Sequence, residues 1–279
     1  IEMNVTPDEE VHVENAGIYV ELPEDATGNV TAYIDGNEVA NVIVVEGTAY
    51  VIIPKLEVGE CNVTVVYSGD DKYESASRNT TLNVTKFEPF MKIEAENVTV
   101  GENTTIFIDL SFGIDDITVT VDGTPVDNVV IDNVTSTVTI SKEMLVAGNH
   151  TVVVTFNGNN KFEKGSVNAT FYVNASDVTP EIIVPQNLTA GETTIEVKVP
   201  QGATGNVTVK VGENEFEAPI EDGDAKVPVG VKTGANIVTV SYPGDENYNG
   251  FEVTGMIIAG AKDSNANITV PEEAKVGDN

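Results

Sequence analysis

The chain repeats one short sequence pattern three times, and the copies begin at residues 67, 156 and 242. Each copy reads aromatic residue, any residue, Gly, Asp or Asn, two variable residues, aromatic residue. The spacings of 89 and 86 residues are those of a small domain. A repeat of that length predicts modules in tandem, so function is expected in reach and presentation more than in one pocket.

A second pattern agrees with this register. Ala-Thr-Gly at residues 26–28 recurs at 203–205, two periods later, and Val-Pro at 184–185 recurs at 270–271. The last recurrence indicates the first strand of a further copy, so we expect the chain to be part of something longer. The predicted organisation is three repeats and a fragment, with these boundaries: 1–86, 90–175, 178–261 and 265–279.

Apolar and polar residues alternate at period two within each copy, as in Asn62-Val63-Thr64-Val65, and Val, Ile and Thr dominate these runs. Seven short strands in one copy indicate a two-sheet immunoglobulin-like sandwich. The predicted fold class is all-β, with tandem immunoglobulin-like β-sandwiches in an elongated array. For the first copy the expected strands are 3–5, 18–22, 30–34, 38–44, 48–53, 62–67 and 78–84.

Turns and linkers follow from the same pattern. Asp35-Gly36 and Asp122-Gly123 lie between alternating runs and predict tight hairpins. The best helix candidate, residues 141–146, is one or two turns long. The linkers at 86–89 and 175–180 are short, which limits the array to bending.

The repeated aromatic pattern reads as the hairpin loop between the last two strands of each copy. Its Gly is expected in a conformation that is costly for other residues, and its two aromatic residues are expected to cap one end of the core. The residues of this structural hairpin motif are Tyr67, Gly69, Asp70, Tyr73, Phe156, Gly158, Phe162, Tyr242, Gly244 and Tyr248.

The charge balance excludes two classes of partner. The chain has 45 acidic and 14 basic residues, a formal net charge of −31. That charge repels nucleic acid phosphates and anionic lipid headgroups, so neither partner is expected. No run of 18 apolar residues occurs, so membrane insertion of this segment is not expected. The acidic surface is read as a solubilising coat.

The sequence contains no recognisable pattern of catalytic or metal-binding residues. Cys61 is the only cysteine, and its register equivalents are His150 and Asn236, which argues against a nucleophile. His12 and His150 lack metal-ligand spacing. No catalytic, metal or cofactor-binding residue and no enzyme activity are predicted. One alternative stays open, a calcium site at Asp70, Asp71 and Glu74 that would stiffen a junction, although Asn at 159 and 160 weakens it.

Fourteen Asn-x-Ser/Thr sequons occur, a density that suits an exported glycoprotein, although strands rich in Asn, Val and Thr also create sequons by chance. Isopeptide cross-links between Lys and Asn stay open too, but basic residues are few. The candidates for glycosylation are Asn29, Asn62, Asn103 and Asn206.

The aromatic pattern is preceded by Gly-x-x-x-Val-x-Val, at residues 59–65, 148–154 and 234–240. In this combination the chain resembles the immunoglobulin-like repeats of prokaryotic surface proteins. It is most similar to those of the large adhesin-like proteins of methanogenic archaea. The resemblance implies an extracellular, cell-surface location and a role in cell adhesion. It does not imply which surface protein or glycan is bound.

Two functions follow as hypotheses. The first is an adhesin-like stalk segment that presents a binding region, with three repeats spanning on the order of 100 Å by strand rise and end loops. The alternative is a self-assembling filament or surface-layer subunit that uses edge-strand pairing. In that alternative, residues 265–279 are the expected self-association strand.

Overall fold

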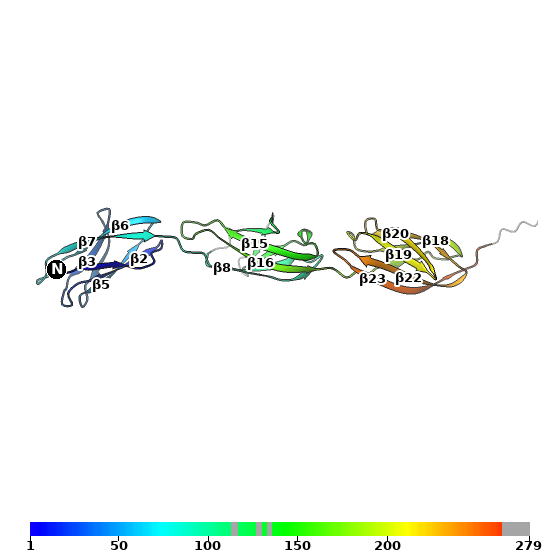
Figure 1. Ribbon diagram of the computed structural model, residues 1–279, viewed down its shortest axis with the longest axis horizontal. Helices are drawn as coiled ribbons and strands as arrows, with labels where there is room; N and C mark the ends of the chain where they lie inside the picture. Colours follow the sequence, from blue (N-terminus) through cyan, green and yellow to red (C-terminus); the bar gives the residue numbers. More distant parts are fainter. Residues whose placement is uncertain (113–116, 127–129, 133–135, 264–279) are drawn as a thin grey trace, which may run out of the picture. The chain divides into compact units, whose positions relative to one another are not determined.

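The computed structural model describes residues 1–112, 117–126, 130–132 and 136–263. Within these ranges the regular structure is almost entirely β-strand, in six sheets (Figure 1). The chain is therefore an all-β protein of tandem immunoglobulin-like sandwiches, as the alternation of its residues predicts. The residues of the expected short helix form only a 3₁₀ turn, η2 (Lys142–Met144).

The first sheet pair uses residues 4–84. One sheet has the order β1-β2-β5 and the other the order β4-β3-β6-β7. The strands are β1 (Asn4–Pro7), β2 (Asn15–Glu21), β3 (Asn29–Ile34), β4 (Asn37–Ile43), β5 (Thr48–Pro54), β6 (Gly59–Tyr67) and β7 (Ala76–Val84).

The second sheet pair uses residues 91–174. Its sheets have the orders β13-β14-β10-β8 and β12-β11-β15-β16-β9. The strands are β8 (Met91–Ala95), β9 (Val98–Thr99), β10 (Thr104–Leu110), β11 (Ile117–Val121), β12 (Thr124–Pro125), β13 (Val130–Asp132), β14 (Thr137–Ile140), β15 (Gly148–Phe156) and β16 (Gly165–Asn174).

The third sheet pair uses residues 181–259. Its sheets have the orders β17-β18-β21 and β20-β19-β22-β23. The strands are β17 (Glu181–Ile183), β18 (Gly191–Lys198), β19 (Asn206–Val211), β20 (Asn214–Pro219), β21 (Asp224–Val231), β22 (Gly234–Gly244) and β23 (Asn249–Ala259).

Alternation of side chains explains why these segments are strands. Successive residues point to opposite faces, so every second Val or Ile enters the core while Asn and Thr face water. Ile18 on β2 and Val51 on β5 pack with Val30 and Val65 from the facing sheet, and all four are fully buried. Each such side chain contributes about 1.5–3 kcal/mol on burial. The strands of the third sheet pair form an equivalent core.

The predicted tight hairpins are present. Asp35 and Gly36 have φ of 49° and 79°, and Asp122 and Gly123 have φ of 50° and 80°. Two consecutive residues in the left-handed region make a type I′ turn, which matches the twist of paired strands. All seven strands expected in the first copy are observed, and several begin two or three residues earlier because backbone pairing continues beyond the apolar alternation.

By its contacts the chain divides into two compact units. The first comprises residues 1–95, 105–139 and 151–170, and the second comprises 96–104, 140–150 and 171 onward. The hydrophobic core of the first sheet pair lies in the first unit, and that of the third lies in the second. The predicted boundaries 1–86, 90–175 and 178–261 stay a prediction, and the fragment 265–279 lies outside the described residues.

Candidate functional site

The three copies of the aromatic pattern all connect the last two strands of a sheet pair. We call residues 67–73, 156–162 and 242–248 the first, second and third aromatic loops. The first aromatic residue of each loop is buried: Tyr67 and Phe156 are 0% exposed and Tyr242 is 2% exposed. The second aromatic residue, Tyr73, Phe162 or Tyr248, is half-buried in every copy.

The Asp or Asn of the pattern holds its own loop closed. Oδ1 of Asp70 accepts the backbone N–H groups of Lys72 (2.8 Å) and Tyr73 (2.7 Å). Oδ1 of Asn159 makes the two equivalent bonds in the second loop, both 2.8 Å, and Oδ1 of Asp245 makes them in the third, at 2.8 and 2.9 Å. One side-chain oxygen is enough for this turn, so Asn serves as well as Asp.

The second carboxylate oxygen explains the difference between Asp and Asn. Oδ2 of Asp70 accepts the backbone N–H (2.7 Å) and the hydroxyl (3.0 Å) of Thr27, and Oδ2 of Asp245 binds Thr204 at the same distances. These threonines belong to the Ala-Thr-Gly pattern, which the second copy lacks. The two sequence patterns are therefore two sides of one contact.

Electrostatics agree with this geometry. The hydrogen bond from the Thr27 N–H, followed by those of Lys72 and Tyr73, holds the pKa of Asp70 well below its usual range. Partial burial raises the pKa of Asp245, but the bonds from Thr204 and Asn247 outweigh it and lower that pKa overall.

The calcium alternative is not supported by this arrangement. Both oxygens of Asp70 are occupied by donors from Thr27, Lys72 and Tyr73, and Asp71 and Glu74 are exposed. Among the described residues, no three His, Cys, Asp or Glu side chains gather closely enough to hold a metal ion. Asp70 and Asp245 act as hydrogen-bond acceptors within the protein.

The buried hydroxyls of Tyr67 and Tyr242 differ in their hydrogen bonding. Tyr67 donates to the carbonyl of Thr27 (2.6 Å), and burial is the main cause that raises the pKa of Tyr67 to about 12. The Tyr242 hydroxyl is buried without a hydrogen-bond partner in the described part of the chain. The first loop is therefore bonded more completely to its Ala-Thr-Gly neighbour than the third.

The preceding linker pairs with the second aromatic loop through a single parallel β-bridge, Phe87 with Phe162, within the first compact unit. Phe87 donates to the carbonyl of Lys161 (2.9 Å) and accepts from the N–H of Glu163 (2.9 Å). The Phe87 ring stacks on His12, with ring centroids 4.5 Å apart, and lies 5.9 Å from the ring of Phe162.

Lys161 Nζ lies 2.5 Å from Glu14 Oε1 and 5.6 Å from the centres of the Phe87 and Phe162 rings. Both side chains of the ion pair are substantially exposed, so the pair itself contributes little, up to about 1 kcal/mol. The backbone bonds and ring contacts therefore hold this linker.

The third aromatic loop receives its linker in the same way, within the second compact unit. Ser176 donates to the carbonyl of Asn247 and accepts from the N–H of Asn249, both at 2.8 Å. The Asn249 amide donates to Asp177 (2.8 Å), and the Asn247 side chain accepts the N–H of Ala147 (2.8 Å). The second and third aromatic loops are thus both hairpins and docking sites for linkers. Sequence reasoning missed this because backbone pairing leaves no residue signature.

The register equivalents Cys61, His150 and Asn236 lie at the start of β6, β15 and β22. His150 Nε2 is 2.7 Å from the carbonyl of Val146, and Asn236 Nδ2 donates to the carbonyl of Lys232 (2.7 Å). Both side chains therefore bond the carbonyl four residues earlier. Cys61 is half-buried, and burial raises the pKa of its thiol. The positions have a structural role in the two copies where this bond is seen.

His12 lies beside a hydroxyl and a carboxylate. Its Nδ1 lies 3.1 Å from Thr85 Oγ1, and its Nε2 lies 3.9 Å from Glu10. The Thr85 hydroxyl is 3.2 Å from the Val11 carbonyl, and His12 Nδ1 is 3.2 Å from the Lys86 carbonyl. These carbonyls hold both groups in place, so the set ties the linker to the sandwich and does not form an activated nucleophile.

The sequons follow from strand alternation. In Asn-Val-Thr, Asn and Thr face water while Val enters the core. Asn62 accepts a bond from Thr81, and Asn79 accepts one from Thr64, each at 2.9 Å, so two sequons on β6 and β7 are cross-bonded. All four glycosylation candidates are exposed: Asn29, Asn62, Asn103 and Asn206.

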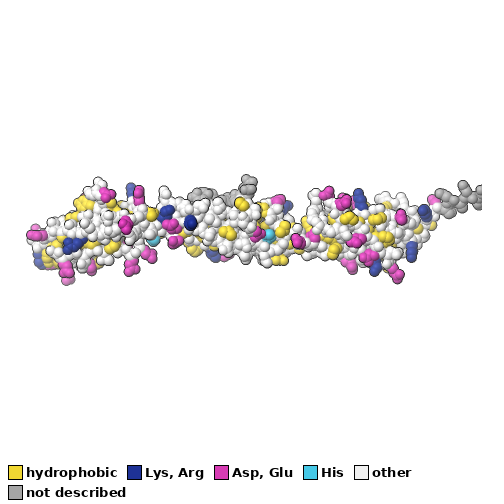
Figure 2. All heavy atoms as spheres, turned by 45° about the horizontal axis from the view of Figure 1, so that its top comes forward, with side chains coloured by type: hydrophobic (Ala, Val, Ile, Leu, Met, Phe, Trp, Pro, Cys, Tyr) yellow, Lys and Arg dark blue, Asp and Glu magenta, His cyan; other side chains and the backbone are white. Residues whose placement is uncertain are grey.

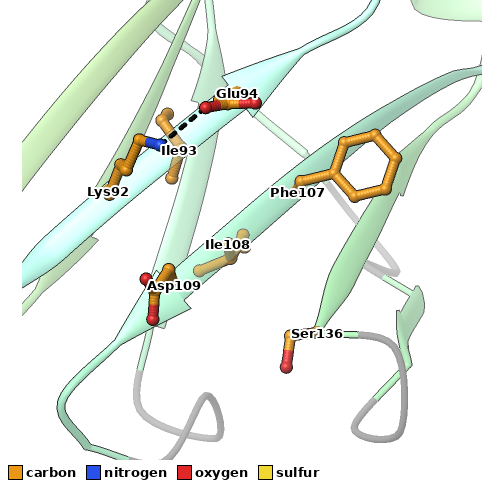
Figure 3. A pocket seen from close by; sticks show the side chains of 7 residues that line it. All are labelled: Lys92, Ile93, Glu94, Phe107, Ile108, Asp109 and Ser136. Atoms are coloured by element: carbon orange, nitrogen blue, oxygen red, sulfur yellow. Dashed lines mark ion pairs between the residues drawn. The ribbon is translucent and has the colours of Figure 1, made fainter.

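A shallow pocket of about 210 Å³ lies on the outer face of β8 and β10 (Figure 3). Phe107 and Asp109 come from β10, while Lys92 and Glu94 on β8 form an ion pair of 2.7 Å. The Lys92 ammonium lowers the pKa of Glu94.

The face shown in Figure 2 carries dispersed acidic side chains and scattered basic ones. Within the described residues no helix is long and apolar enough to cross a membrane.

Known proteins resemble this chain in structure. No protein-family model matches the sequence, and no curated protein matches it. Solved structures that are similar include the I9–I11 tandem of titin (11% identity, 94% of this chain, 100% of that chain, TM-score 0.32). Others are immunoglobulin domains 1–4 of Sidekick-1 (12%, 94%, 76%, 0.28) and fibronectin(III)-like modules of Clostridium thermocellum CbhA (18%, 61%, 94%, 0.27). At these TM-scores the likeness says nothing of ligands or partners.

Proposed function

We propose that the chain is a segment of an extracellular adhesin-like stalk. In this proposal three immunoglobulin-like modules, residues 1–86, 90–175 and 178–261, hold a binding region away from a cell surface. The resemblance to the repeats of archaeal adhesin-like proteins, which rests on the aromatic pattern and the Gly-x-x-x-Val-x-Val that precedes it, points to that setting.

The observation that carries the proposal is the docking of both linkers. Phe87 and Ser176 each make two backbone hydrogen bonds, one to the aromatic loop that follows them in sequence and one to the residue directly after that loop. A free linker leaves its backbone groups to water, whereas a paired one loses the freedom to swing. A spacer needs that stiffness, because a flexible chain gains reach only with the square root of its length.

The surface chemistry suits the same role. The net charge of −31 disfavours non-specific association with other acidic surfaces. The exposed sequon asparagines offer attachment points for glycans on an exported protein. Neither feature needs a pocket, and a spacer needs none.

The proposal is tested by measuring distances between two spin labels, on either side of the second linker, in a Cys61→Ser background. The wild-type linker is expected to give a narrow distance distribution. Ser176→Pro removes the N–H that bonds Asn247 and is expected to broaden it, whereas Ser176→Ala keeps that N–H and is the matched control. A broad distribution in the unaltered linker would contradict the stalk proposal.

A second measurement addresses reach directly. Small-angle scattering of the chain is expected to give a maximum dimension on the order of 100 Å, from three modules placed end to end. A much smaller dimension would contradict the proposal even if the linkers were stiff.

A further inference from the structure

The outer face of the sheet β1-β2-β5 carries two exposed tyrosines. Tyr19 on β2 lies directly opposite Tyr50 on β5, and Gly17 lies opposite Ile52 on the same two strands. Tyr19, Tyr50 and Ile52 are 41%, 50% and 55% exposed, while the residues on either side of each in sequence are buried in the core. These three side chains therefore point away from the core, on one face of the sheet.

The ring of Tyr50 is held in one position on this face. Its hydroxyl donates to Asp8 Oδ2 (2.9 Å), and the same oxygen accepts the backbone N–H of Gly17 (2.9 Å). The Asp8 N–H donates in turn to the Gly17 carbonyl (3.0 Å). A ring that is already fixed loses little freedom when a ligand binds to it. We call Asp8, Gly17, Tyr19, Tyr50 and Ile52 the tyrosine face.

Gly17 makes room for the Tyr50 ring. A Cβ at position 17 would lie 1.8 Å from the Tyr50 hydroxyl oxygen, 2.2 Å from Tyr50 Cζ and 2.4 Å from Asp8 Oδ2. The φ of Gly17 lies outside the left-handed region, so the backbone itself does not require glycine here. The glycine therefore serves the position of the ring.

The fold does not require aromatic side chains in this row. Tyr19 is seven residues before the Ala-Thr-Gly pattern of the first copy, and Glu196 is seven residues before that of the third. Glu196 pairs with Lys226, where Tyr19 pairs with Tyr50. Opposite charges across two strands suit a row that faces water. The two tyrosines are therefore an addition to the sandwich.

The second copy has an aromatic residue at the same register. Phe107 lies opposite Glu94 on β8, as Tyr19 lies opposite Thr6 on β1. Phe107 is 44% exposed and borders the shallow pocket (Figure 3). An exposed ring thus recurs on the outer face of the corresponding sheet, and the first copy adds a second ring beside it.

The charged groups around the tyrosine face are hydrogen-bond acceptors. The outward-pointing residues of β1, β2 and β5, which are strands that the structure describes in full, include one charged residue, Glu21, and no basic residue. Glu21 lies two positions after Tyr19 on the same face, and Asp8 adds a second carboxylate. An anionic ligand meets no counter-charge here, whereas a ligand rich in hydroxyl donors finds acceptors.

The size of the exposed surface limits the class of partner. At their exposures, the two tyrosines and Ile52 together offer on the order of 300 Å². A specific protein interface needs about 800 Å² on each partner. A basic partner would be drawn to the whole acidic surface, with its net charge of −31, and gains little at a face with one charged strand residue. The face therefore suits a small neutral ligand.

We propose that the tyrosine face binds a neutral glycan, with pyranose rings stacked on Tyr50 and Tyr19. A pyranose presents C–H groups on its faces and hydroxyls around its edge. The C–H groups carry a slight positive charge and pack on the electron-rich face of an aromatic ring, and the hydroxyls donate to carboxylates such as Glu21. The proposal goes beyond the stalk function and does not depend on it, because neither linker contributes a residue to this face.

Calorimetric titration of the full chain with cellotetraose, tetra-N-acetylchitotetraose and mannotetraose tests the proposal. At least one of these neutral probes is expected to bind, with a dissociation constant of roughly 0.1–1 mM. Tyr50→Ala is expected to weaken that binding about tenfold or more. Tyr172→Ala removes a similarly exposed tyrosine from β16 and is the matched control, expected to have no effect. No binding of any probe, or an equal effect of the two variants, would overturn the proposal.

Gly17→Ala tests the position of the ring while both tyrosines are kept. The added Cβ displaces Tyr50 and Asp8 at the ends of their flexible side chains, so the fold is expected to persist, which thermal unfolding checks. Glycan binding is expected to weaken as in Tyr50→Ala. Gly230→Ala on β21, where a Cβ meets nothing closer than 3.9 Å, is the control and is expected to bind normally. Wild-type affinity in a folded Gly17→Ala variant would overturn the stacking role.

A basic peptide is the rival occupant, and hexa-arginine is its probe. Its association with the acidic chain is expected to be unchanged by Tyr50→Ala and to disappear at about 0.5 M salt, where charge interactions are screened. If Tyr50→Ala instead weakened hexa-arginine binding and left every sugar unaffected, the face would belong to a cationic partner and the glycan proposal would fail.

Discussion

At the scale of residues, the fourth position of the aromatic loop depends on what lies across from it. Asp70 and Asp245 use one oxygen for their own turn and the other for Thr27 or Thr204, whereas Asn159 uses one oxygen for its turn alone. One oxygen at this position therefore closes the turn in every copy, whereas the second oxygen is used only where a threonine lies opposite.

This reading predicts an order of stability. Asp70→Asn keeps an acceptor for Lys72 and Tyr73 but cannot accept the Thr27 N–H through its amide nitrogen, and Asp70→Ala loses every bond. Thermal unfolding of the first module is expected at a temperature highest for wild type, lower for Asp70→Asn and lowest for Asp70→Ala. Asn159→Asp, without a threonine partner, is the control and is expected to change little.

The pH dependence has a definite sign. Because folding lowers the pKa of Asp70, its stabilising effect is present above the unfolded carboxylate range, about 4, and is lost as pH falls below it. The gap in melting temperature between wild type and Asp70→Asn is therefore expected to be large at neutral pH and to shrink in acid. A gap independent of pH would contradict the role of the ionised carboxylate.

The two aromatic residues of one loop are expected to contribute unequally to the free energy of unfolding. Phe156 is fully buried and stacks on Phe112 with ring centroids 3.8 Å apart, while Phe162 is half-buried. Phe156→Ala is expected to lower the free energy of unfolding by about 3–5 kcal/mol, and Phe162→Ala by less. Chemical denaturation measures both, and equal losses would contradict the burial argument.

At the scale of elements, Gly36 and Gly69 have the same backbone angle φ but differ in the room available for a Cβ atom. Gly36 and Gly69 both have φ of 79°. A Cβ at Gly36 meets nothing within 4 Å, whereas at Gly69 it would lie 2.8 Å from Ser75 N and 2.9 Å from Tyr73 O. The hairpin needs only the angle, and the aromatic loop needs the room as well.

Gly36→Ala is accordingly expected to cost about 1–2 kcal/mol, from left-handed strain alone. Gly69→Ala is expected to cost clearly more, because backbone atoms rather than a flexible side chain must move. Urea unfolding of the two variants makes the comparison. A similar loss in both would show that the loop adapts without strain.

At the scale of the whole molecule, the hydrophobic cores are assembled from continuous stretches of chain. All core residues of the first sheet pair lie between residues 3 and 87, and those of the third lie between 182 and 259. A core that closes on itself supplies its own driving force for folding.

Residues 178–261, expressed alone, are therefore expected to fold cooperatively, with a single unfolding transition and dispersed amide resonances. The same result is expected for residues 1–86. An unfolded fragment would contradict the predicted boundaries.

Alternation and turn residues were sufficient for the strands. The period-two pattern located all seven strands of the first sheet pair, and the Asp-Gly pairs at 35–36 and 122–123 located two hairpins, because both signals are local. The strand ends were less certain, since pairing of Ala16 and Gly17 with β5 needs no apolar alternation. The aromatic loops were located as hairpins for the same local reason.

The sequence by itself determined the fold class and the strand positions, since periodicity and turn chemistry are readable along the chain. Tertiary structure alone decided which groups meet: Asp70 with Thr27, Phe87 with the second aromatic loop, and Met256 on β23 with Ile237 on β22. The physical reason is that backbone hydrogen bonds and edge exposure depend on neighbours distant in sequence, and they leave no mark on residue type.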